Sequence, residues 1–201
     1  MPNWCYTTIH IDYDDEEKLK EFDDLLDKWT DFDFIPNGFG LQWLGNIVGN
    51  SKIGEVEDNK SPNYLKCRGT LCDVSLTGNT LSITTETAWE PMLKMWTKLV
   101  DKYLPGAELT YYAEELGCGI LATNDETYRD KYWADIWDGP ENIVFEADDS
   151  LSEKCIIEML QLLLDEDSKD IEYLLGKFNE SDFSDGMSIH KWNIDPITVW
   201  N

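Results

Sequence analysis

The sequence predicts an α+β protein, because strand-like and helix-like patterns alternate along most of its 201 residues. Residues 4–12 (WCYTTIHID) alternate apolar with polar positions and are rich in β-branched and aromatic side chains, which is typical of a strand. Residues 14–27 place apolar side chains at three- and four-residue steps, which is typical of a helix. The composition, 42% hydrophobic with nine Trp, nine Tyr and seven Phe, suffices for a substantial core.

The first half of the chain contains two further well-marked elements. Residues 71–76 and 81–85 flank a Thr-Gly-Asn-Thr turn, which predicts a β-hairpin. A helix is expected over 89–103, with Pro91 in its first turn, where proline is tolerated. Between the first helix and the hairpin, residues 34–64 are rich in Gly and Pro and predict a long loop that holds at most a short strand at 44–48.

The second half begins with strand patterns and then changes period. Strands are expected over 109–113, 119–122 and 128–137. Two amphipathic helices follow, over 156–164 and 171–178, and the apolar tail 187–201 is expected to pack back as a strand. The sequence therefore predicts two domains, one over 1–140 and an acidic helical extension over 141–201 whose apolar tail packs back on the first.

The order strand, helix, hairpin, helix, strand over residues 4–122 is close to a ferredoxin-like βαββαβ unit with an antiparallel sheet, here followed by the added acidic helical region. Three segments also resemble the YubB-type ferredoxin-like proteins of phages and plasmids: MPNWC at 1–5, TETAWEP at 85–91, and YAEE at 112–115 followed by Gly117 and Gly119. The resemblance covers roughly the first 125–140 residues. It implies an origin in a mobile genetic element and brings no catalytic motif. The chain is expected in the host cytoplasm, because it has no apolar stretch long enough to cross a bilayer and no signal-like start.

The net charge of −25 is concentrated in two blocks. Residues 11–33 hold eleven acids and three bases, and residues 108–186 hold twenty-two acids and five bases. Such a chain repels nucleic-acid phosphates and anionic membrane surfaces, so neither is an expected direct partner. It attracts basic protein surfaces over a range of roughly 8 Å at physiological salt.

The residues that carry out most enzyme chemistry are sparse or poorly arranged, so the sequence predicts a protein that is not an enzyme and uses no cofactor. His10 and His190 have no nucleophile motif beside them, although His10 and Asp12 share a strand face. The acidic run from Asp165 fails as a calcium loop because Lys169 stands at the third ligand position. The five cysteines suggest buried free thiols. A metal-assisted enzyme is kept as a further alternative, without a dedicated metal site.

The leading hypothesis is an acidic phage inhibitor that imitates DNA and occupies the basic nucleic-acid-binding surface of a host defence protein, as an anti-CRISPR or anti-restriction factor. Two groups of carboxylates are the expected contact surface, the first preferred: Asp148, Asp149, Glu153, Glu158, Asp165, Glu166, Asp167, Asp170 and Glu172, then Asp14, Asp15, Asp23, Asp24 and Asp27. The alternative is a host-takeover or assembly module that binds through Trp133, Trp137 or Trp200. The target and the oligomeric state stay open.

Overall fold

A computed structural model describes residues 3–136 and 150–200 and has the mixed α+β architecture expected from the sequence. The chain forms two compact units. The first contains Met1–Asn124 together with Asp195–Asn201, and the second contains Asp125–Ile194. The division after Asn124 therefore precedes the boundary expected at residue 140.

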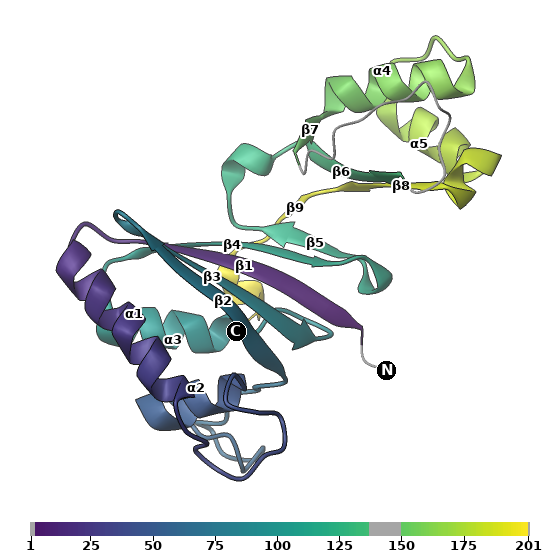
Figure 1. Ribbon diagram of the computed structural model, residues 1–201. Helices are drawn as coiled ribbons and strands as arrows, with labels where there is room; N and C mark the ends of the chain where they lie inside the picture. Colours follow the sequence, from purple (N-terminus) through teal and green to yellow (C-terminus); the bar gives the residue numbers. More distant parts are fainter. Residues whose placement is uncertain (1–2, 137–149, 201) are drawn as a thin grey trace. The chain divides into compact units, whose positions relative to one another are not determined.

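The first unit is a sheet covered by helices on one face (Figure 1). Its strands follow the order β2-β3-β1-β4-β5, with antiparallel pairing throughout. Strand β5 extends the sheet beyond the order of a simple βαββαβ unit. The elements are β1 (Trp4–Asp12), α1 (Glu16–Thr30), α2 (Leu44–Ser51), β2 (Gly69–Thr77), β3 (Thr80–Ala88), α3 (Leu93–Tyr103), β4 (Glu108–Glu115) and β5 (Ile120–Thr123).

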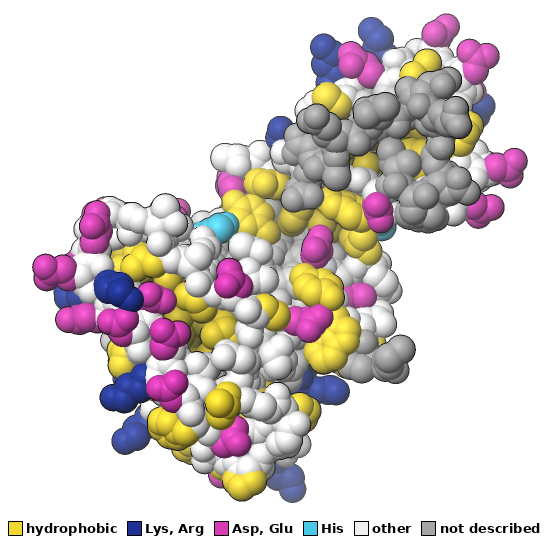
Figure 2. All heavy atoms as spheres, viewed as in Figure 1, with side chains coloured by type: hydrophobic (Ala, Val, Ile, Leu, Met, Phe, Trp, Pro, Cys, Tyr) yellow, Lys and Arg dark blue, Asp and Glu magenta, His cyan; other side chains and the backbone are white. Residues whose placement is uncertain are grey.

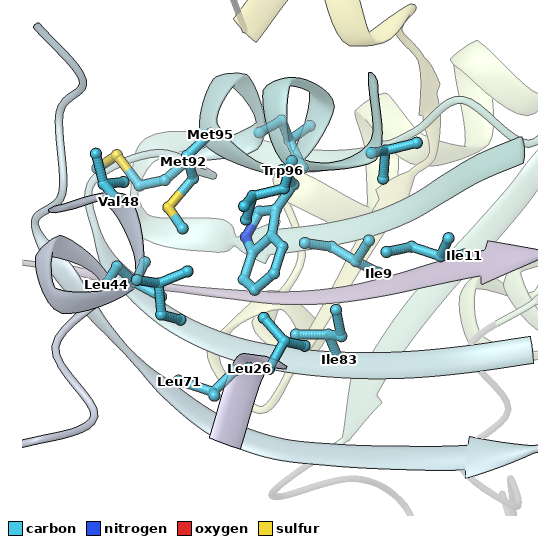
Figure 3. Packing of buried hydrophobic residues seen from close by; sticks show 14 of the residues in the cluster. Ile9, Ile11, Leu26, Leu44, Val48, Leu71, Ile83, Met92, Met95 and Trp96 are labelled. Atoms are coloured by element: carbon cyan, nitrogen blue, oxygen red, sulfur yellow. The ribbon is translucent and has the colours of Figure 1, made fainter. Parts of the chain in front are cut away.

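The core of the first unit lies between the sheet and these helices. Alternate residues of β1, among them Ile9 and Ile11, are fully buried, while their neighbours along the strand lie on the opposite face. Trp96 of α3 lies among side chains of the sheet, including Ile9 and Ile83 (Figure 3). This alternation leaves the second face of the sheet without a covering helix of the same unit.

Two local expectations for the first unit are wrong. Residues 44–48 belong to helix α2 rather than to a short strand, since a segment this short carries no period that separates the two. Asn46 inside this helix is fully buried and bonds to the preceding loop. Helix α3 begins at Leu93 and not at 89, because Trp89 has a positive φ of 78°, which no helix residue adopts. The other expected strands and helices of the first unit occur, β1 with the expected bounds and the rest with shifted ends.

The second unit packs two helices on a small sheet (Figure 1). The sheet has the order β7-β6-β8. Its core contains Tyr132, Leu160, Leu174, Phe178 and Met187, drawn from both helices and from the two longer strands. The elements are β6 (Lys131–Ile136), β7 (Leu151–Ser152), α4 (Glu153–Leu164), α5 (Ile171–Asn179), β8 (Met187–Lys191) and the two-residue β9 (Asn193–Ile194).

The expected tail strand divides between the two units. Met187–Lys191 is strand β8 of the second unit, paired with β6. The last residues form a short 3₁₀ helix, Ile197–Trp200, which packs against the core of the first unit. There the indole of Trp200 donates to the Tyr111 hydroxyl at 2.8 Å, and that hydroxyl donates to the Asp195 carbonyl at 2.9 Å. Within the described ranges, none of the helices has the length and apolar character needed to cross a bilayer.

Candidate functional site

The preferred acidic surface centres on the turn between α4 and α5, residues 165–170, which we call the acidic corner. Asp165 ends α4 in the left-handed conformation, with φ 52°. Asp170 caps α5, since its carboxylate accepts from the Tyr173 backbone N–H at 3.2 Å. The Gln161 side chain donates to the carbonyls of Asp167 and Ser168, at 3.3 and 2.8 Å. These bonds hold the backbone of the corner in one shape while Asp165, Asp167 and Asp170 remain exposed.

The other carboxylates predicted in the second unit do not all belong to this corner. Glu166 is paired with Lys177, and Glu158 lies 3.6 Å from Lys154 on the exposed side of α4. Glu153 begins α4 and accepts from the Tyr132 hydroxyl at 3.4 Å, whereas Glu172 is exposed in the first turn of α5. Asp148 and Asp149 lie outside the described residues. The structure therefore brings together only part of the predicted set.

The second group of carboxylates lies on and just before α1, where acidic side chains gather at the surface of the first unit (Figure 2). Asp15 is the N-cap, with its carboxylate accepting from the Lys18 N–H at 3.1 Å, and this bond lowers its pKa. Lys20 pairs with Asp23 at 3.0 Å and with Asp24 at 2.5 Å. Asp14 and Asp27 are exposed. Lys20 is shared by Asp23 and Asp24 and so offsets one of their two charges, and residues 11–33 keep a net charge of −8.

The three tryptophans of the alternative hypothesis differ in their surroundings. Trp133 is half-buried, with its ring 5.9 Å from that of His190. Trp200 is half-buried and bonded to Tyr111, as described above. Trp137 lies outside the described residues. Both described side chains are thus partly exposed and make contacts within the protein.

A further acidic and aromatic arrangement, which the sequence reasoning missed, lies on the face of the first sheet opposite its helices. Tyr6 of β1 stands opposite Glu86 of β3 on one side and Glu114 of β4 on the other. Tyr6 is 49% exposed, and its hydrogen bond to Glu86 raises its pKa. The strand alternation could have shown that Tyr6 points away from the core, but only the register places two carboxylates beside it.

The groups considered for catalysis are engaged in structural contacts. His10 Nδ1 lies 2.9 Å from Ser82 Oγ, and its ring meets Tyr112 edge-on, so Ser82 rather than Asp12 is its partner. Burial lowers the pKa of His190. Among the described residues, no three His, Cys, Asp or Glu side chains come close enough together to hold a metal ion.

The cysteines are all free, but the expectation that they are buried is wrong for three of them. Cys5 and Cys67 are buried, whereas Cys72, Cys118 and Cys155 are exposed. Burial raises the pKa of Cys5 to about 11 and that of Cys67 to about 12, so both thiols stay protonated.

In comparisons with known proteins, no family model, no curated protein and no solved structure matches this chain. The resemblance to YubB-type proteins therefore stays a prediction.

Proposed function

We propose that this protein is a non-catalytic inhibitor that binds the basic, nucleic-acid-binding surface of a host defence protein through the acidic corner. The observation that carries the proposal is that the corner is both exposed and held by its own hydrogen bonds. A preformed array of carboxylates binds without a large ordering cost, which favours tight association.

The charge of the second unit supports this choice of surface. Residues 125–194 contain nineteen acids and six bases, a net charge of −13, which exceeds the net −12 of the longer first unit. Duplex DNA presents about one charge per 1.7 Å of its axis, and a DNA-binding channel lined with Lys and Arg is complementary to a dense anionic surface. Association is expected to be fast at low salt and to weaken as salt rises.

We also infer that the first unit is ferredoxin-like and that the chain derives from a phage or plasmid. The order β2-β3-β1-β4, with α1 and α3 on one face, supports the fold. The motifs at 1–5, 85–91 and 112–119 support the origin. The fold itself does not name a function, so the inhibitor proposal rests on the charge and geometry of the second unit.

This function can be tested by capturing the partner protein from a lysate and then measuring whether this chain displaces DNA from it. The full chain, immobilised, is exposed to a bacterial lysate at low and at raised salt, and each captured protein is purified and given fluorescently labelled duplex DNA. The proposal predicts a captured nucleic-acid-binding protein that is lost at raised salt and releases its DNA competitively when this protein is added. Capture that resists salt, by a protein whose DNA binding is unaffected, would favour the aromatic interaction module instead.

A further inference from the structure

The first unit contains a cavity of about 270 Å³ that the inhibitor proposal does not use. It lies where β1 and β2 begin and β3 ends, and residues between Phe39 and Arg68 supply much of its lining. Four aromatic side chains contribute to its walls, Trp4, Phe39, Trp43 and Tyr64, and one cationic side chain, Arg68, lines it. A cavity with mostly apolar walls and a single charged group has the general character of a small-molecule site.

Trp43 is held in a fixed orientation in this cavity. Its indole N–H donates to the Cys67 carbonyl at 2.6 Å. The indole also lies directly against Gly45, where a Cβ atom would come within 2.3 Å of the ring. The Phe39 ring is 5.8 Å from that of Trp43, tilted by 31°. A rigid aromatic wall with a second ring beside it is suited to receive another flat ring.

The loop that carries Phe39 is tied down by one buried side chain. Asn46 of α2 is fully buried, and its amide nitrogen donates to the Leu41 carbonyl at 3.0 Å and to the Gly40 carbonyl at 3.3 Å. Its amide oxygen accepts from the Phe34 backbone N–H at 3.0 Å. The loop that carries Phe39 is therefore fixed by hydrogen bonds and forms an ordered wall of the cavity.

Arg68 gives the cavity its charge preference. The residue is exposed, and within the described part of the chain its guanidinium forms no ion pair, whereas the nearby Lys66 is paired with Glu90 at 2.5 Å. A free guanidinium in a chain of net charge −25 is available to an incoming anion. Guanidinium groups bind carboxylate, sulfonate and phosphate oxygens with charge-assisted hydrogen bonds.

We propose that this cavity binds a small planar aromatic molecule that carries one negative charge, with its ring against Trp43 and Trp4 and its anionic group on Arg68. The volume admits a compact ring system and not an extended ligand. The proposal is independent of the inhibitor function, since the acidic corner belongs to the other unit.

A pair of fluorescent naphthalene dyes tests the proposal, naphthalene-1-sulfonate and the uncharged naphthalene-1-sulfonamide, which share one planar ring system. The native full chain is expected to bind the sulfonate saturably at one site. Arg68→Gln should weaken the sulfonate about tenfold and leave the neutral dye unchanged, because only the charged hydrogen bond is lost. Trp4→Ala should weaken both dyes. Lys94→Gln, which removes an exposed cation from α3, is the matched control and should change neither.

Arg68 and Trp4 are both exposed, so these variants should fold, and far-ultraviolet circular dichroism verifies this. A second measurement uses the unmodified protein: the sulfonate should shift the indole N–H resonance of Trp43 in a two-dimensional NMR spectrum. Absence of saturable sulfonate binding would overturn the proposal. Equal binding of the sulfonate by the parent chain and Arg68→Gln, or no shift at Trp43, would overturn it as well.

Discussion

The two units carry almost the same net charge on very different amounts of core. The first unit, residues 1–124 and 195–201, carries −12 and encloses a continuous core that includes Trp96 and Tyr111. The second unit, residues 125–194, carries −13 and has a much smaller core around Leu160 and Phe178. Self-repulsion opposes compaction, and a small core offers less to offset it. We therefore expect the second unit to be the less stable of the two, with a surface that is more acidic for its size.

The largest expected effect on stability comes from a substitution in the core of the second unit, which should leave the core of the first unit intact. Leu160→Ala removes a fully buried side chain and should destabilise the second unit by about 2–5 kcal/mol. Hydrogen exchange measured by mass spectrometry should then show lost protection in α4, α5, β6 and β8, with β1 and β3 still protected. Leu162→Ala on the same helix is the control, because Leu162 is 73% exposed. Equal loss of protection in both units would show that they unfold as one.

The next effect concerns the loop of the first unit. Asn46→Ala leaves the Phe34 N–H and the Leu41 carbonyl without their partner, which should cost about 1–3 kcal/mol. Urea unfolding measures the loss, and Asn59→Ala, at an exposed position, should change stability little. The substitution should also weaken binding of the sulfonate dye, because Phe39 loses its support. Unchanged stability would mean that the loop does not depend on Asn46.

A pH-dependent effect belongs to the second unit. Lys191 donates to Asp130 at 2.8 Å, and this contact lowers the pKa of Asp130 below its ordinary value of 3.8. A lowered folded-state pKa contributes stability above the ordinary value and loses it as the pH falls through the folded value. Asp130→Asn should therefore be less stable than the parent at neutral pH, and the difference should vanish in acid. Thermal unfolding at a series of pH values measures this, and a pH-independent difference would contradict it.

The smallest expected effect on stability concerns the residue that directly follows a helix, which can be compared between the two units. Lys52 and Asp165 follow α2 and α4 with φ of 58° and 52°, a conformation that glycine adopts without strain. Lys52→Gly should raise stability by about 1 kcal/mol, and Asp165→Gly by less, because Asp tolerates the left-handed conformation better than Lys does. Asp165→Gly should gain more at low salt than at high salt, because it also removes repulsion from the acidic corner. Lys94→Gly, inside α3, should instead lower stability.

Local sequence patterns predicted most helices and strands. They failed where contacts between residues far apart in the sequence determine the structure. Strand β1 occurs over Trp4–Asp12, as its alternation predicts, and the hairpin turns at Gly78, whose φ is 57°. Residues 44–48 (LGNIV) are too few to distinguish a strand from a helix by period, and in the structure they form the first half of helix α2.

The division of the chain also depends on distant pairing. Residues 125–140 look like a continuation of the first domain, but β6 pairs with β8, near the end of the chain. The acidic corner could be recognised from its run of acidic residues. The hydrogen bonds that hold its backbone come from Gln161, which is uncharged and does not stand out in the sequence. The cavity was not foreseen, because its walls come from separate segments. The Gly- and aromatic-rich loop at 34–64 was the available signal, since loops of that length are often functional.

The inhibitor proposal places recognition in the acidic corner of the second unit rather than on α1. Asp165→Asn, Asp167→Asn and Asp170→Asn together remove three charges and preserve the cap of α5, because Asn caps as well as Asp. Asp14→Asn, Asp24→Asn and Asp27→Asn remove three charges beside α1 and serve as the matched set. The decisive measurement is the affinity of each triple variant for the DNA-binding protein captured by the parent chain, at low and raised salt. We predict a large loss for the corner variant with a reduced salt dependence, and little loss for the α1 variant. Equal losses, or no loss at the corner, would contradict the proposal.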